Sequence, residues 1–172
     1  MSTARSGLEV RPAEPGDVAE LCGLLNEIIA IGGTTAFETP MTEEDFHRAF
    51  IDAPGLISLF VAVGEGGRLL GFQFLTSHDK LPDDWADIAT FARVGSQTAG
   101  IGRALFSETL SLARQRGLAA INATIRADNE GGLAYYDRMG FITYSVDRAV
   151  PLQSGLPVDR VSKIFRVSLP GA

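Results

Sequence analysis

An apolar, strand-like run that passes through glycines into a helical pattern is the feature that most restricts the fold. The run spans residues 88–94, Gly100 and Gly102 follow it, and the helical pattern continues to Arg116, where Gly117 ends it. A strand that leads through a turn into a helix needs a sheet to join and a helical layer packed on that sheet. We therefore expect an α/β (α+β) fold.

The rest of the chain predicts a mixed, mostly antiparallel sheet of about seven strands. Strands are predicted at 8–13, 56–63, 69–75, 88–94, 118–125, 141–146 and 161–169, and helices at 18–29, 42–50, 100–116 and 130–139. Hairpins dominate the first half and strand-helix-strand alternation the second, so helices should cover both faces. No repeat or linker interrupts the 172 residues, which predicts one domain over 1–172 with 1–6 as a flexible tail.

Composition argues against several classes of partner. Fifteen Lys plus Arg against 21 Asp plus Glu give a net charge of -6, which lacks the basic footprint of nucleic-acid binding. The single cysteine, Cys22, permits no intramolecular disulfide and is typical of a reducing compartment. No signal-peptide pattern and no run of ~18 apolar residues is present. We therefore expect a cytoplasmic protein without a nucleic-acid or membrane partner.

The segment QTAGIGRAL, residues 97–105, has the chemistry of a backbone anion site. Glycines let main-chain N–H groups approach a ligand, and a helix N-terminus adds unpaired donors and roughly half a positive charge. A phosphate or pyrophosphate fits such a site. No Gly-Lys-Ser/Thr follows, and Leu105 stands where a dinucleotide fingerprint has glycine or alanine. The alternative is a tight strand-to-helix turn that binds nothing.

The pattern Q-x-x-G-x-G between a strand and a helix resembles the coenzyme A pyrophosphate loop of the GNAT superfamily of N-acetyltransferases. The resemblance implies a GNAT fold with a V-shaped split between two central parallel strands, and acetyl-coenzyme A as co-substrate. It assigns the pyrophosphate to the backbone of Gln97, Thr98, Ala99, Gly100, Ile101, Gly102 and Arg103, and the pantetheine arm to Phe91, Ala92 and Val94. Relatives often carry glycine and a basic residue at the positions of Thr98 and Ala99, so charge assistance should come mainly from Arg103.

The segment AYYDRMGF, residues 134–141, resembles the second motif of that superfamily. The resemblance makes Tyr136 the general acid toward the departing thiolate. A phenol of pKa near 10 can protonate a thiolate of pKa about 8.5 and stays neutral at pH 7. The alternative is a core tyrosine, because Leu133, Tyr136 and Met139 form an apolar stripe. Asn129 matches an asparagine that contacts pantetheine, and it is also a good helix N-cap.

The acceptor side needs a group that removes a proton, because an ammonium cannot attack a thioester. Asp87 lies ten residues before Gln97, where the phosphinothricin and methionine sulfoximine acetyltransferases, a subgroup that the chain resembles, have a glutamate. Asp87 is therefore the candidate base, with a solvated strand-end aspartate as the alternative. The same resemblance implies a homodimer and a small primary amine as acceptor, an amino-acid analogue included. Candidate substrate-pocket residues are Phe37, Glu38, Phe74, His78 and Trp85.

The predicted reaction is direct transfer of acetyl from acetyl-coenzyme A to that amine, without a covalent enzyme intermediate. His78 and Asp79 lack the further ligands that a metal site needs, so no metal is expected. Acetylation of a protein N-terminus or lysine stays open, because loops set acceptor specificity. A coenzyme A binding module without catalysis is the other alternative, although it would have no need of Tyr136 and Asp87.

Overall fold

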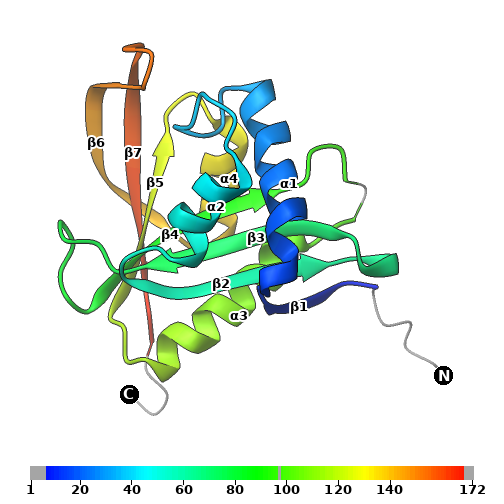
Figure 1. The fold of residues 1–172 in the computed structure, drawn as a ribbon. Helices are drawn as coiled ribbons and strands as arrows, with labels where there is room; N and C mark the ends of the chain where they lie inside the picture. Colours follow the sequence, from blue (N-terminus) through cyan, green and yellow to red (C-terminus); the bar gives the residue numbers. More distant parts are fainter. Residues whose placement is uncertain (1–6, 97, 169–172) are drawn as a thin grey trace.

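The computed structural model describes residues 7–96 and 98–168 (Figure 1). In chain order the main elements are β1 (Glu9–Pro12), α1 (Val18–Ile31), α2 (Glu43–Phe46), β2 (Leu56–Val63), β3 (Leu69–Thr76), β4 (Trp85–Ala92), α3 (Ile101–Gln115), β5 (Ala120–Arg126), α4 (Glu130–Met139), β6 (Ile142–Pro151) and β7 (Pro157–Arg166). A π-helical turn, His47–Ile51, continues α2. The predicted succession of strands and helices is confirmed.

The strands form one sheet in the order β1-β2-β3-β4-β5-β7-β6. Neighbouring strands are antiparallel except β4 and β5, whose parallel pairing joins only Trp85–Ile88 to Ala120–Ala123. Both strands continue beyond this pairing, β4 to Ala92 and β5 to Arg126. They therefore separate toward their carboxyl ends, which is the predicted V-shaped split.

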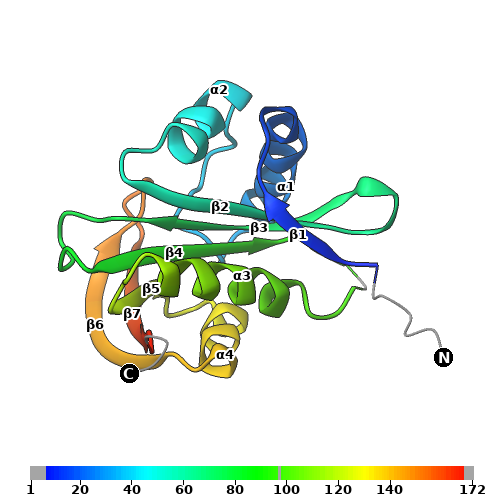
Figure 2. The ribbon, with the colours of Figure 1, turned by 90° about the horizontal axis from the view of Figure 1, so that it is seen from below.

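Helices cover both faces of the sheet, as predicted. Figure 2 shows α1 and α2 on one face and α3 and α4 on the other. On the first face Leu21, Phe46 and Phe72 are fully buried in one apolar cluster. On the second face Phe106 and Phe141 pack with their ring centroids 5.4 Å apart. Each such side chain contributes about 1.5–3 kcal/mol on burial, so the two layers hold the split strands in place from both sides.

Several predicted boundaries are wrong for physical reasons. The strand predicted at 88–94 spans Trp85–Ala92, and Val94 lies beyond it, 50% exposed. Because Asp87 is polar, it interrupts the apolar run from which the strand was predicted, and the first part of the strand was missed. β6 runs to Pro151 rather than to residue 146, and nearly all its side chains are exposed, so no alternation marks its end. β7 spans Pro157–Arg166 rather than 161–169, and residue 169 lies outside the described part.

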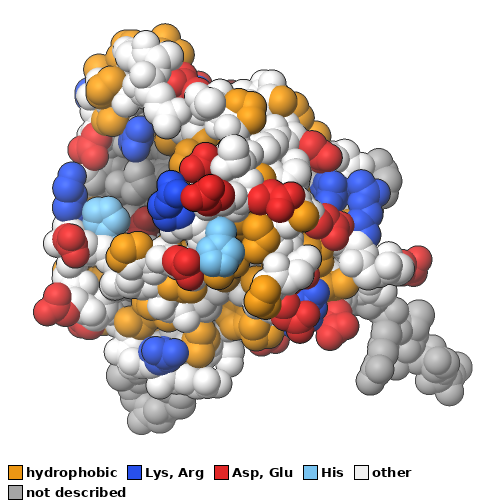
Figure 3. Space-filling view, viewed as in Figure 1, with side chains coloured by type: hydrophobic (Ala, Val, Ile, Leu, Met, Phe, Trp, Pro, Cys, Tyr) orange, Lys and Arg blue, Asp and Glu red, His pale blue; other side chains and the backbone are white. Residues whose placement is uncertain are grey.

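The surface bears on the expected partners. Figure 3 shows acidic and basic side chains interspersed over the face viewed there, without a large basic patch. Within residues 7–96 and 98–168, no helix has the length and apolar character to cross a membrane. The cytoplasmic location and the single-domain organisation stay predictions, and the expected tail, 1–6, lies outside the described residues.

Candidate active site

A cavity of about 580 Å³ opens where β4 and β5 separate. Its walls come from the ends of these two strands, the loop after α1, the first turn of α3, α4 and one residue of β7. The volume lies in the range of small-molecule and cofactor sites. It brings together eight of the residues predicted from the sequence: Phe37, Asp87, Phe91, Ala92, Val94, Gly102, Asn129 and Tyr136.

The start of α3 carries free backbone donors. The helix begins at Ile101, and the first hydrogen bond into the preceding loop joins Ala104 N to the oxygen of Gly100 at 2.9 Å. Among the described residues, the N–H groups of Gly102 and Arg103 have no acceptor. Gly100 has a φ of 81°, a left-handed conformation that suits glycine. Two free donors at a helix N-terminus form a favourable place for an anion.

A neighbouring tyrosine leaves no room for a side chain at Gly102. Its φ is not positive, but a Cβ there would lie 2.4 Å from Cε2 of Tyr135. The Tyr135 hydroxyl donates to the oxygen of Gly102 at 2.8 Å. Gly102 is therefore required by the space that Tyr135 leaves, whereas Gly100 is required by its left-handed backbone. Tyr135 ties the start of α3 to α4, so the loop and the second motif form one unit.

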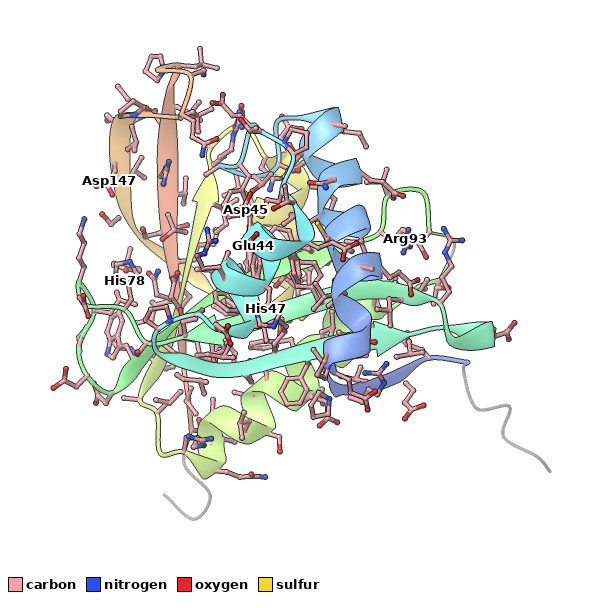
Figure 4. The ribbon with its side chains drawn as sticks, in the orientation of Figure 1. Glu44, Asp45, His47, His78, Arg93 and Asp147 are labelled. Atoms are coloured by element: carbon pink, nitrogen blue, oxygen red, sulfur yellow. The ribbon has the colours of Figure 1, made fainter. Side chains whose placement is uncertain are left out.

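The charge near this loop belongs to Arg103 rather than to Arg93. Arg93 lies at the end of β4 (Figure 4), where its Nε donates to the oxygen of Leu69 at 2.9 Å and its terminal nitrogens pair with Glu20 and Glu27. Arg103 is exposed. Thr98 and Ala99 are exposed as well, and Gln97 lies outside the described residues.

Tyr136 on α4 lines the cavity and is 6% exposed. Its hydroxyl oxygen lies 2.9 Å from Oγ1 of Thr90 on β4. Gln73 on β3 donates from Nε2 to Thr90 Oγ1 at 2.9 Å and to the Tyr135 hydroxyl at 3.2 Å. Burial raises the pKa of Tyr136 well above its ordinary value. The phenol is therefore neutral at ordinary pH, and a network from two strands positions it.

Asp87 lies within β4 and not at a solvated strand end. It lines the cavity, and its Oδ1 accepts a hydrogen bond from Asn122 Nδ2 at 2.8 Å. Burial raises the pKa of Asp87, while the hydrogen bond from Asn122 and the nearby His78 act in the opposite direction. A carboxyl group whose pKa is raised toward neutrality, beside a cavity, is suited to accept a proton. Tyr144 donates its hydroxyl proton to Oδ1 of Asn122 and so holds that amide in place.

Asn129 caps α4, as its residue type predicts. Its Oδ1 accepts from Gly132 N at 2.9 Å, and its Nδ2 donates to the oxygen of Thr34 at 3.1 Å. A Cβ on Gly132 would lie 2.4 Å from Asn129 Nδ2, whereas a Cβ on Gly131 would make only an ordinary contact, 3.9 Å from Asn129 Oδ1. Asn129 therefore fixes both the first turn of α4 and the loop after α1, and both glycines line the cavity.

The predicted acceptor residues are spread over several places. Phe37 lines the cavity. The Glu38 carboxylate accepts from the backbone N and the Oγ of Ser154 at 2.6 and 2.7 Å, which joins the loop after α1 to the β6–β7 hairpin. Phe74 packs against Phe50, with ring centroids 5.0 Å apart. Glu38 and Phe74 are outside the cavity lining.

His78 and Trp85 are also outside that lining. His78 lies in the loop between β3 and β4, on the opposite side of the molecule from Arg93 in Figure 4, and its Nδ1 accepts from Lys80 N at 3.1 Å. Trp85 packs edge-on against Tyr144, with 6.2 Å between the ring centroids. In the described part of the chain, no three His, Cys, Asp or Glu side chains are grouped to hold a metal ion. The absence of a metal from the reaction stays a prediction.

Reasoning from the sequence missed Thr90, Asn122, Tyr135 and Arg160. Thr90 and Asn122 interrupt otherwise apolar strands, and this signal could have marked them. Tyr135 adjoins Tyr136, the residue that the motif marks, and no local pattern indicates its hydrogen bond to Gly102, 33 residues away. Arg160 lies on β7 far along the chain, and no local pattern connects it with the cavity that it lines.

Comparison with known proteins agrees with this geometry. A sequence model described as the acetyltransferase (GNAT) family matches residues 25–141. Mycothiol acetyltransferase of Rhodococcus jostii is 36% identical over 105 residues, which cover 59% of this chain and 34% of that protein. The enzyme of the same name from Mycolicibacterium paratuberculosis is 33% identical over 160 residues, 83% of this chain and 49% of that protein. The matches thus span between a third and a half of these curated relatives.

Solved structures share the fold. A phosphinothricin acetyltransferase from Sinorhizobium meliloti in complex with acetyl-coenzyme A has a TM-score of 0.81 at 20% identity, over 94% of this chain and 89% of that one. An N-acetyltransferase from Staphylococcus aureus has a TM-score of 0.81 at 18% identity, over 95% of this chain and 100% of that one. At these identities the likeness establishes the predicted fold and leaves the acceptor open.

Proposed function

Because the chain belongs to the GNAT acetyltransferase family, we propose that it transfers the acetyl group of acetyl-coenzyme A to the primary amine of a small molecule. The supporting observation is that Tyr136, Asp87 and Gly102 line one cavity in the strand split. Bound acetyl-coenzyme A would supply an activated thioester as the acetyl donor. The chain itself would provide binding, orientation and proton handling.

The residues around the cavity fit this co-substrate. The free N–H groups of Gly102 and Arg103 would hold the pyrophosphate. The edge of β4 that faces β5 is unpaired beyond Ile88, so the backbone there can pair with the amide groups of the pantetheine arm. Phe91 and Ala92 lie on this stretch, and Val94, past its end, adds an apolar wall.

Asp87 and Tyr136 divide the proton handling. Asp87 would accept the proton of the acceptor ammonium, since its pKa is raised by burial. Tyr136 would present its hydroxyl proton to the negative charge that develops on the leaving sulfur. Because burial raises the pKa of Tyr136 above that of a free phenol, its hydroxyl would act more by stabilising this charge through a hydrogen bond than by full proton transfer. The general-acid role predicted from the sequence is narrowed accordingly.

Hydrogen bonds that fix the loop after α1 beside the cavity favour a small molecule over a polypeptide. Glu38 joins the loop after α1 to the β6–β7 hairpin through its two hydrogen bonds with Ser154. Arg126 NH1 donates to the oxygen of Thr35 at 2.9 Å and holds the same loop against β5. A loop held at both points would limit the room for an extended peptide beside the cavity.

Thiol release tests the proposal. Wild-type protein with acetyl-coenzyme A is expected to release thiol when primary amines are added, and acetyl-coenzyme A is expected to raise the melting temperature. At 100 times Kd, such binding stabilises the folded state by about 2.7 kcal/mol. Gly100→Val should lose both effects, because a branched side chain resists the left-handed φ of 81°. The backbone that leads to the N–H groups of Gly102 and Arg103 would then be displaced.

Gly66→Val is the matched control. Gly66 also has a left-handed φ, 72°, and open space around its Cβ position, as Gly100 has, but it lies in the β2–β3 hairpin outside the cavity lining. Both variants should lose similar stability, and only Gly100→Val should lose the response to acetyl-coenzyme A. An undiminished response in Gly100→Val would contradict the assignment of the loop. Coenzyme binding without turnover of any amine would support the non-catalytic alternative.

We also propose that the protein is a homodimer that associates through β6. This edge strand exposes Ile142 and Val146 by 70% and 41%, and an exposed apolar edge readily pairs with another chain. Light scattering should give twice the monomer mass of 18.3 kDa, and Ile142→Asp should shift the mass toward one chain. Ile31→Asp, at a residue 62% exposed at the end of α1, should not. A wild-type monomer at all concentrations would refute the dimer.

A further inference from the structure

Arg160 reaches the cavity from β7 and has no protein partner in the described part of the chain. Its Nε is buried without a hydrogen-bond acceptor, and no ion pair joins its guanidinium to any of residues 7–96 or 98–168. A guanidinium offers five N–H donors and keeps its charge at every ordinary pH. Holding such a group partly buried and unpaired is unfavourable. The placement therefore indicates that a ligand supplies the missing anion.

The carboxylates on neighbouring segments have other partners or positions. Asp159 accepts from Arg148 NH1 at 2.7 Å and from Ala149 N at 2.8 Å. Glu38 is bonded to Ser154. Asp147 is the register partner of Arg160 on β6, yet no ion pair joins the two, and Figure 4 shows Asp147 at the outer side of the hairpin. None of these three carboxylates forms an ion pair with Arg160.

Arg126, the other arginine in the cavity wall, is fully engaged. It is the register partner of Arg160 across β5 and β7. Its Nε and NH2 donate to the Asp128 carboxylate at 2.9 and 2.7 Å, and NH1 donates to the oxygen of Thr35. Its charge is thus balanced and its donors are used to hold a loop. Among the described lining residues, Arg160 is the cation whose donors are available.

The cavity has opposite charges at its two ends. One face of β5 carries every second residue, which places Asn122, Thr124 and Arg126 on the same side. Arg160, the register partner of Arg126 on β7, faces this side as well. Asp87 pairs in register with Asn122 on that face. Asn122 and Arg126 are four positions apart on β5, a strand length of about 13 Å. Asp87 is the one acidic side chain among the described lining residues.

We propose that the acceptor is a primary amine that also carries an anionic group such as a carboxylate, and that Arg160 binds this group. The proposal rests on the proposed acetyl transfer and narrows its substrate class. A guanidinium binds a carboxylate through two parallel N–H···O bonds, while Asp87 faces the ammonium. An amine without the anion leaves Arg160 unpaired, so binding selects the acceptor at both ends.

Matched acceptors test this assignment. The probes are 4-aminobutyrate and 6-aminohexanoate, each compared with the uncharged amine of the same chain length, butylamine and hexylamine. A charge-assisted hydrogen bond contributes about 1.5–3 kcal/mol, so wild-type kcat/KM should favour at least one amino acid by roughly 10- to 100-fold. Arg160→Gln should remove this preference through KM, with kcat and the kinetics of the uncharged amines little changed.

Arg148→Gln is the matched control, because Arg148 lies on the adjoining strand, is exposed, and is paired with Asp159. It should keep the preference for the anionic acceptors. Equal kcat/KM for charged and uncharged acceptors in the wild type would overturn this inference while leaving acetyl transfer intact. A preference that survives Arg160→Gln would overturn the role of Arg160. Absence of turnover with all four probes would overturn the inference and count against the proposed function. If Arg160→Gln fails to fold, the comparison of acceptors in the wild type still decides the acceptor class.

Discussion

Tyr136→Phe is expected to slow acetyl transfer in a single turnover by roughly 10²- to 10⁴-fold, the range for removal of a catalytic proton donor. The phenyl ring keeps its packing against Phe141, 5.0 Å away between centroids. Thr90 keeps its hydrogen bond from Gln73, so stability should fall by about 1 kcal/mol at most. Because burial raises the pKa of Tyr136, the hydroxyl does not titrate near neutral pH. The rate should therefore fall by the same factor at each pH.

Tyr135→Phe separates this effect from a loss of coenzyme binding. The Tyr135 hydroxyl donates to the oxygen of Gly102 at the start of α3, so its removal should weaken the affinity for acetyl-coenzyme A. Tyr136→Phe should leave that affinity nearly unchanged and lower the rate at saturation. Rapid-quench kinetics and coenzyme titration of both variants measure the two quantities. A near wild-type single-turnover rate in Tyr136→Phe would assign this residue to core packing.

Asp87→Asn is expected to lower kcat/KM by roughly 10²- to 10⁴-fold at neutral pH, with recovery at alkaline pH, where the acceptor is already a free amine. Asparagine keeps the acceptor oxygen for Asn122 Nδ2 but cannot take a proton. The wild-type profile should rise as Asp87 loses its proton, at a pH above the ordinary aspartate value because burial raises its pKa. An unchanged profile in Asp87→Asn would remove this residue from the mechanism.

Stability gives an independent check on Asp87. A folded-state pKa raised above the unfolded value favours folding below the unfolded pKa, and this contribution disappears as pH rises through the folded pKa. Asparagine does not ionise, so Asp87→Asn should become more stable relative to the wild type as pH rises through the folded-state pKa of Asp87. Melting temperatures across about pH 4 to 8 measure the difference. Asp83→Asn, at an exposed residue of the loop before β4, should show no such trend.

Features that depend on nearby residues were predictable from the sequence. Thr42 caps α2 by accepting from Asp45 N at 3.1 Å, and Asn129 caps α4. Gly100 has the left-handed conformation at the start of α3. Each of these needs a partner within a few residues or a backbone angle of one residue, so residue type and spacing suffice. The strand-loop-helix unit, the two motifs and the fold class follow from the same local rules.

The shape of the site depended on contacts between distant residues. Gln73, Thr90 and Tyr136 come from β3, β4 and α4, and their side chains meet only because the sheet and α4 pack together. Glu38 was predicted to line the pocket, but it is bonded to Ser154, 116 residues away, and lies outside the cavity lining. The sequence left open whether Asp87 is a solvated strand end, and the pairing of β4 with β5 places it beside Asn122.

The sequence by itself thus determined the order of elements, the helix caps and the glycine turn, because their energies come from short stretches of chain. The tertiary structure alone decided where charge stands in the cavity. Arg160 reaches it because β7 pairs with β5 and places Arg160 beside Arg126. Whether an arginine is paired with a carboxylate or left available depends on burial and on distances between strands, and neither quantity is encoded in local spacing.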